Sequence, residues 1–111
     1  MTVEEFKKIQ DEFLQEMASK LQFKRDEYAT DTDVLINFKR GAEISGEHPI
    51  DVLKMYALKH EVSLHDLFTD IANGTEVSKE LFLEKATDFA NYLLLAYAMF
   101  FDEEVGSNAL Q

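Results

Sequence analysis

The stretch that decides the fold is EKATDFANYLLLAYAMFF, residues 84–101. Its second half is apolar on almost every side of a helix, and a helix of that kind needs neighbours all round. Its first half carries Glu84, Asp88 and Asn91 at steps of four and three residues, which places them on one side of the same helix. Such a row of polar side chains predicts either a chemical site beside the helix or charged partners that neutralise it.

The composition predicts one small helical domain. The chain has 111 residues, of which 46% are hydrophobic and 30% are charged. This length is typical of a single domain, and only one proline and four glycines favour long regular helices. The absence of cysteine excludes disulfides and thiolate metal sites, and it suits a reducing compartment, so we expect a cytoplasmic protein.

The charge balance excludes two classes of partner. The chain carries 22 acidic and 11 basic residues, giving a net charge of −11. This charge repels nucleic-acid phosphates and anionic membrane surfaces. The longest apolar run, residues 93–101, is much shorter than the roughly 20 residues that cross a membrane. We therefore expect neither a nucleic acid nor a membrane as partner.

The spacing of apolar residues predicts four helices. In the first, apolar residues recur at steps of three and four from Phe6 to Leu21, and Lys20 belongs to its solvated face. Thr2 and Glu5 fit a capping box at its start. The four predicted helices cover residues 3–28, 34–45, 49–72 and 79–104.

Residues with strong turn and cap preferences separate these helices. Asp33 is suited to cap the second helix and Gly46 to end it. Pro49, directly after His48, suits the first turn of the third helix, and Ser78 suits the cap of the fourth. The sequence thus predicts an all-α bundle of three long helices and one short helix, with a domain at residues 1–104 and a flexible tail at residues 105–111.

The last helix also predicts self-association. Four helices of one short chain supply too few neighbours for a helix that is apolar almost all round. We therefore expect a homodimer or homotetramer with the C-terminal helix at its centre.

The polar row on the last helix is a candidate metal site. Carboxylates at positions i and i+4, such as Glu84 and Asp88, can share one Mg²⁺ ion, because Mg²⁺ takes oxygen ligands. Two carboxylates do not fill its octahedron, and Glu61 or Glu27 can add ligands. The alternative is that Glu84 and Asp88 pair with basic residues of a facing helix.

Two further clusters are candidates for phosphate contacts. In the first, Glu61 and His65 form an i,i+4 pair, His60 lies on the apolar face as a core histidine, and Lys59 meets either a phosphate or the acidic row. The second is a local basic patch, which either holds a phosphate or forms ordinary salt bridges. This patch contains Lys24, Arg25, Tyr28, Asn37, Lys39 and Arg40.

Four motifs carry a resemblance to a known group. They are Lys24-x-x-Glu-Tyr28, Asp31-x-Asp33-x-x-x-Asn37-Phe38, Lys59-His60-x-x-Ser63-x-x-Asp66 and Glu84-Lys85-x-x-Asp88-x-x-Asn91-Tyr92-Leu93. Over residues 20–98 the chain resembles small uncharacterised phage proteins and, more distantly, the all-α MazG-like nucleoside triphosphate pyrophosphohydrolases. The resemblance implies a Mg²⁺-bound helical oligomer that cleaves a nucleotide to its monophosphate and pyrophosphate, in the host cytoplasm if the chain is phage-encoded.

The resemblance to these hydrolases is incomplete at the metal motifs. Their second acidic motif, Glu-Glu-x-x-Asp, matches Glu84, Lys85 and Asp88, so that a lysine replaces one glutamate. Of their first motif, Glu-Glu-x-x-Glu, only Glu61 is present. The first hypothesis is therefore a nucleotide-binding protein, with metal at Glu84, Asp88, Glu61 and Glu27, catalysis aided by Glu61, and the nucleotide held by Lys24, Tyr28, Asn37, Lys39, Arg40, Lys59 and Asn91.

Two other hypotheses stand beside it. The second is a non-catalytic helical oligomer that acts as a protein-interaction module, in which Lys59 and Lys85 neutralise Glu84 and Asp88 in the interior. The third is an inhibitor that imitates DNA with its acidic surface, and it rests on net charge alone.

Overall fold

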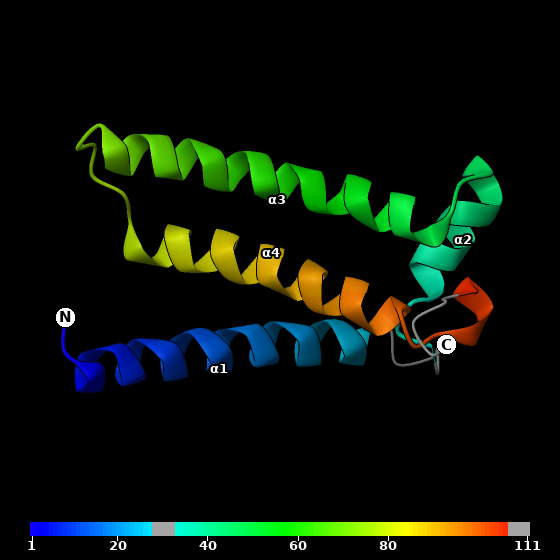
Figure 1. The fold of residues 1–111 in the computed structure, drawn as a ribbon, viewed down its shortest axis with the longest axis horizontal. Helices are drawn as coiled ribbons and strands as arrows, with labels where there is room; N and C mark the ends of the chain where they lie inside the picture. Colours follow the sequence, from blue (N-terminus) through cyan, green and yellow to red (C-terminus); the bar gives the residue numbers. More distant parts are fainter. Residues whose placement is uncertain (28–32, 107–111) are drawn as a thin grey trace.

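The structure, a computed structural model, is all-helical over the part of the chain that it describes. It describes residues 1–27 and 33–106, with the side chains of residues 1–21 and 33–106. The described residues form four α-helices and a final 3-10 turn, and their arrangement is drawn in Figure 1. They are α1 (Val3–Glu27), α2 (Ile36–Ser45), α3 (Pro49–Ala72), α4 (Lys79–Met99) and the turn η1 (Glu103–Val105).

The predicted start of the first helix is confirmed in detail. The Thr2 hydroxyl accepts a hydrogen bond from the Glu5 backbone N–H at 3.1 Å, and the Glu5 carboxylate accepts one from the Thr2 N–H at 2.8 Å. This reciprocal pair satisfies two N–H groups that a helix start leaves free.

The predicted caps at Ser78 and Gly46 are also present, whereas Asp33 does not cap α2, whose N-cap residue is Leu35 without a side-chain hydrogen bond. The Ser78 hydroxyl accepts from the Leu81 N–H at the start of α4. Gly46 ends α2 with a left-handed φ of 76°, a conformation that glycine adopts without a steric penalty. Asp33 caps the turn just before α2, because its carboxylate accepts from the Leu35 N–H at 2.9 Å. The helix itself therefore begins at Ile36, two residues later than predicted.

His48 caps α3 and also ties it to the end of the chain. Its Nδ1 accepts from the Ile50 N–H at 3.1 Å, which places the ring proton on Nε2. Nε2 in turn donates to the Val105 carbonyl at 3.2 Å. One imidazole thus joins two segments that are 57 residues apart.

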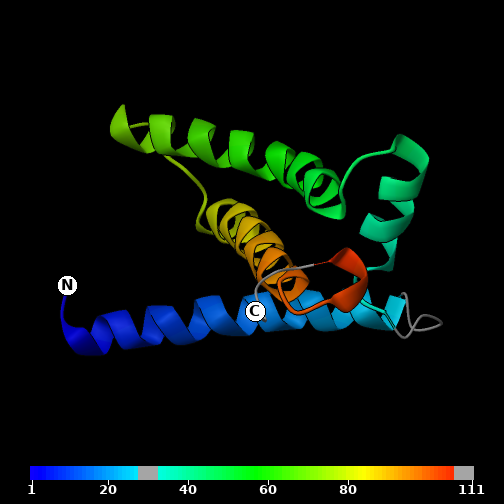
Figure 2. The same cartoon turned by 45° about the vertical axis from the view of Figure 1, so that its right-hand side comes forward.

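The helix α4 lies between α1 and α3. It contacts both of them, and α3 and α4 run in opposite directions as a helical hairpin (Figures 1 and 2). The short α2 packs against the beginning of α3. Among the described residues, no helix is long and apolar enough to cross a membrane.

One connected cluster of buried apolar side chains lies at one end of the molecule, where α2 meets the start of α3 and the end of α4. It is formed by Leu35, Phe38, Ala42, Val52, Leu53, Met99 and Val105. Farther along α3, Ala57, Leu64 and Leu67 are also buried, whereas none of the described side chains of α1 is.

The end of the chain differs from the prediction. The helix α4 ends at Met99 rather than near Glu104. The Asp102 carboxylate then accepts hydrogen bonds from the Glu104 and Val105 N–H groups and starts the η1 turn. Val105, which we predicted to begin a flexible tail, is buried in the core. The rest of the predicted tail, apart from Gly106, lies outside the described residues.

Candidate functional site

Asp88, the central residue of the predicted metal site, lies where three helices meet. Its Oδ1 is 3.1 Å from the Lys20 Nζ of α1, and its Oδ2 is 3.7 Å from His60 Nδ1 of α3. The side chains of Lys20 and Asp88 are only 21% and 16% exposed. A carboxylate this far removed from water is stabilised by a charged partner, and Lys20 of α1 supplies one, while the imidazole of His60 approaches from α3.

The Lys20 amine has a full set of acceptors on α4. Besides Asp88, it donates to the Thr87 hydroxyl at 2.9 Å and to the Glu84 backbone carbonyl at 3.0 Å. An ammonium group has three N–H donors, so this geometry uses all of them. The fully buried Thr87 hydroxyl in turn donates a hydrogen bond to the Leu83 carbonyl at 2.6 Å. Lys20 therefore holds α1 against the middle of α4.

Asn91 makes a further polar contact between α4 and α1, about one helical turn after Asp88. Its side-chain amide donates to the Met17 carbonyl of α1 at 3.1 Å. Its Oδ1 is buried and has no hydrogen-bond partner among the described residues. The predicted nucleotide contact of Asn91 is therefore, in the structure, a contact between two helices.

The remaining predicted metal ligands are not gathered around Asp88. Glu84 is exposed, and Glu61 faces solvent on α3, where it lies 4.0 Å from His65 as the i,i+4 pair predicted. The side chain of Glu27 is outside the described set. Among the side chains of residues 1–21 and 33–106, no three acidic or histidine groups are placed to hold a metal ion. Because Asp88 already faces a lysine ammonium, the described residues do not fit Mg²⁺.

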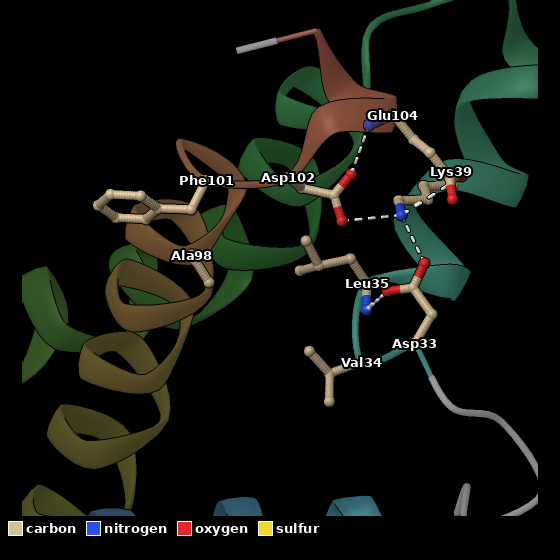
Figure 3. A pocket seen from close by; sticks show the side chains of 8 residues that line it. All are labelled: Asp33, Val34, Leu35, Lys39, Ala98, Phe101, Asp102 and Glu104. Atoms are coloured by element: carbon tan, nitrogen blue, oxygen red, sulfur yellow. Dashed lines mark hydrogen bonds and ion pairs between the residues drawn. The ribbon is translucent and has the colours of Figure 1, made fainter. Parts of the chain in front are cut away.

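Lys39 of the predicted basic patch belongs to an ion-pair cluster. Lys39 bonds to Asp33 and to Asp102, the latter at 2.9 Å, and lies 3.5 Å from Glu104 (Figure 3). These residues line an open hollow of about 460 Å³ together with Val34, Leu35, Ala98 and Phe101. Three carboxylates around one amine give the hollow a net negative charge, which disfavours a phosphate there.

The two central groups of this cluster have shifted pKa values. Burial of the Lys39 amine lowers its pKa, but its hydrogen bonds to Asp33 and Asp102 and the negative charges of both raise it by more. The pKa of Lys39 therefore lies above its ordinary value. The hydrogen bond from Lys39 lowers the pKa of Asp102, against the smaller opposing effect of burial.

The other predicted phosphate contacts are dispersed. Asn37 and Arg40 of α2 are exposed, and Lys59 is exposed on α3. Lys24 belongs to α1, but its side chain is not among those described, and Tyr28 lies outside the described residues. The described part of the chain thus does not bring the predicted nucleotide contacts to one place.

Sequence reasoning missed Lys20 because it assigned this residue to the solvated face of the first helix. Lys20 does follow Phe13 and Met17 at helical spacing, so its stem belongs to the apolar stripe. A long side chain can lie along such a stripe and place its charge at the far end. The helical spacing of Lys20 from Met17 was therefore the feature of the sequence that could have identified its inward position.

The most exposed part of α4 is its apolar side. Asp88 and Asn91 point toward α1, and Tyr92 packs its ring on His60 of α3, so the opposite side of α4 is turned away from both helices. We call this side the outer face of α4. It contains Leu83, Ala86, Ala90, Leu93, Leu94, Tyr97, Phe100 and Phe101. Phe101, just after the end of α4, also borders the hollow beside Leu35.

The outer face is both large and uncharged. Its five largest exposed side chains, all in the second half of the face, are between 45% and 62% exposed. Tyr97 packs its ring against Phe101 at 5.1 Å and against Phe100 at 6.5 Å, so the aromatic end forms one continuous surface. Contiguous exposed apolar surface of this kind marks an interaction site.

Comparisons of the chain with models of protein families, with curated proteins and with solved structures found no match.

Proposed function

We propose that this chain is a non-catalytic helical interaction module that associates with a second copy of itself through the outer face of α4. The observation that carries the proposal is the exposed apolar side of α4. On the outer face, Leu93, Leu94, Tyr97, Phe100 and Phe101 are between 45% and 62% exposed. The helix contacts α1 and α3 through other side chains, among them Asp88, Asn91 and Tyr92. The exposed side of a surface helix in a monomeric protein is normally polar.

The size and charge of the surface favour a second copy as the partner. A fully buried aromatic side chain covers roughly 150–250 Å², so the exposed parts of the five large side chains amount to roughly 500 Å² per copy. A standard interface takes about 800 Å² from each partner, and flanking apolar groups can supply the rest. Each copy carries a charge of −11, so two copies avoid repulsion best at a face without charges.

The contacts of Asp88 with α1 and α3 support a structural role for this carboxylate. Asp88 is neutralised by Lys20 and faces His60, so its charge is used to join three helices. This arrangement corresponds to the hypothesis of a non-catalytic oligomer, except that Lys20 takes the role that we assigned to Lys59 and Lys85.

Sedimentation velocity tests the proposal. The wild-type chain is expected to sediment as a dimer or larger assembly, and Leu93→Glu is expected to sediment as a monomer, because it places a charge at the centre of the outer face. Leu58→Glu, the same change at an exposed leucine of α3, is the matched control and leaves the assembly intact. A wild-type chain that is monomeric at all accessible concentrations would refute the proposal.

The competing hypothesis, a Mg²⁺-dependent nucleotide pyrophosphohydrolase, predicts a different result. A ligand that binds only the native state raises the midpoint of thermal unfolding. For an interaction module, MgCl₂ with any of the common nucleoside triphosphates leaves this midpoint unchanged. A rise that disappears in Asp88→Asn would favour the nucleotide hypothesis and would contradict the structural role given to Asp88.

A further inference from the structure

The outer face of α4 also defines how two copies meet. Leu83, Ala86, Ala90, Leu93, Tyr97 and Phe100 follow one another at steps of three, four, three, four and three residues. This alternation is the spacing of a two-helix seam, in which successive side chains insert between those of a facing helix. Phe100 belongs to the seam because its backbone keeps helical angles one residue past the end of α4.

Side-chain size is distributed unevenly along this seam. The first half contains the two alanines, Ala86 and Ala90, whereas the second half contains Leu93, Tyr97 and Phe100. Close packing requires large side chains to face small ones, because like sizes leave gaps at one end and collisions at the other. The seam therefore distinguishes between the two possible directions of a partner helix.

An antiparallel partner helix places the large side chains of one copy opposite the small side chains of the other. With a two-fold axis between Ala90 and Leu93, residues whose numbers are equally far from that axis face each other. Ala90 then faces Leu93 of the other copy, Ala86 faces Tyr97, and Leu83 faces Phe100. Both alanines receive a large side chain, and the helix dipoles of the two copies oppose each other favourably. A parallel partner places alanine on alanine and tyrosine on tyrosine.

We infer that two copies of this chain pair antiparallel through α4, with Ala86 of each copy packed under Tyr97 of the other. The inference rests on the proposed self-association and adds the direction and register of the pair. Because of the two-fold axis, the seams of both copies are buried in the same contact. The assembly therefore closes as a dimer and does not continue into a filament.

Cysteine cross-linking tests this register cleanly, because the chain has no cysteine of its own. The two single variants Ala86→Cys and Tyr97→Cys are oxidised separately and as a mixture, and cross-linked dimer is measured on non-reducing gels. In the antiparallel register, position 86 faces position 97 of the other copy within the Cα distance of about 4.4–6.8 Å that a disulfide spans. The two copies of position 86 are then roughly 16 Å apart along the helix, too far to be bridged.

The expected result is a cross-linked heterodimer in the mixture and its loss when either variant is oxidised alone. Cross-linking of each variant with itself would establish a parallel pair and overturn the inference. A sedimenting dimer that cross-links in none of the three samples would place the contact elsewhere and overturn it as well. Leu58→Cys mixed with Ala86→Cys is the control for random collisions and gives no product.

Two further measurements on the same variants distinguish a wrong register from a failure of the proposed self-association. Circular dichroism shows whether each cysteine variant is folded, and sedimentation velocity shows whether it still forms a dimer. Self-association with the wrong cross-link pattern refutes only the register. A wild-type chain that remains a monomer refutes the proposed function itself.

Discussion

Two regions of this molecule are stabilised in different ways. Where they meet, α2, the start of α3, the end of α4 and Val105 enclose a conventional apolar core. Along α1, by contrast, the contacts with α4 include polar ones from Lys20, Asn91 and Lys79, and many apolar side chains of α1 remain uncovered. The core is closed within one chain, whereas α1 and the outer face of α4 leave apolar side chains exposed.

The largest expected effect is the difference in stability loss between a substitution in the core and one on α1. Phe38→Ala, in the core, is expected to lower the free energy of unfolding by about 3–5 kcal/mol, because it removes a buried ring and leaves a cavity. Phe6→Ala, on the exposed start of α1, is expected to change it by less than about 0.5 kcal/mol. Urea unfolding measures both. Equal losses would show that Phe6 is as well covered as Phe38 and would erase the contrast.

The next effect concerns the polar attachment of α1. Lys20→Met keeps the apolar stem but removes the ammonium from Asp88, Thr87 and the Glu84 carbonyl. We expect a loss of about 1–3 kcal/mol, because partly buried acceptors are left without a donor. Lys8→Met, at an exposed position of the same helix, is the control. Equal stability of the two variants in urea would mean that Lys20 does not hold α1.

A smaller effect is expected where α2 crosses α3. A Cβ atom added at Gly41 would lie 2.8 Å from Cγ1 of Val52, closer than atoms pack. Gly41→Ala is expected to cost about 1 kcal/mol, since overpacking of about 1–3 kcal/mol is partly offset by the better helix propensity of alanine. The double variant Gly41→Ala with Val52→Ala tests this cause, because the clash is then absent. A thermal melt in which Gly41→Ala stabilises the chain would contradict the close approach.

The smallest effect is the pH dependence of the Lys39 cluster. Because the folded state lowers the pKa of Asp102, its charge stabilises the fold above the unfolded pKa, and this contribution disappears as pH falls through the folded value. Wild-type stability is therefore expected to fall more steeply below about pH 4 than that of Asp102→Asn. Glu103→Gln, an exposed neighbour, should keep the wild-type slope. Identical slopes for wild type and Asp102→Asn would mean that the cluster contributes nothing.

The helix positions could be predicted because their signals are local. The Thr2–Glu5 capping box, Pro49 after His48 and the Ser78 cap each depend on neighbours within four residues, and all of them occur in the structure. The early end of α4 was missed although Asp102 and Gly106 flank the η1 turn in a recognisable cap pattern. The long apolar run before them concealed that signal.

The partner of Asp88 could not be predicted, because it depends on how distant helices pack. Lys20 is 68 residues from Asp88 in sequence, and helical periodicity alone gives α1 no particular neighbour. Lys39 shows the same problem, since one of its carboxylate partners follows α4, 63 residues away. Residue type and spacing identified the charged groups, but only the packing determined whether they neutralise each other.

The bond between His48 and Val105 has a consequence for the order of folding. The two residues are 57 positions apart, and the cluster around Phe38 also contains Met99 and Val105. Contacts between residues so distant in sequence form slowly, because a long loop must close first. We therefore expect this cluster to close late in folding, and a stop codon before Met99 would remove part of the core rather than only shorten the protein.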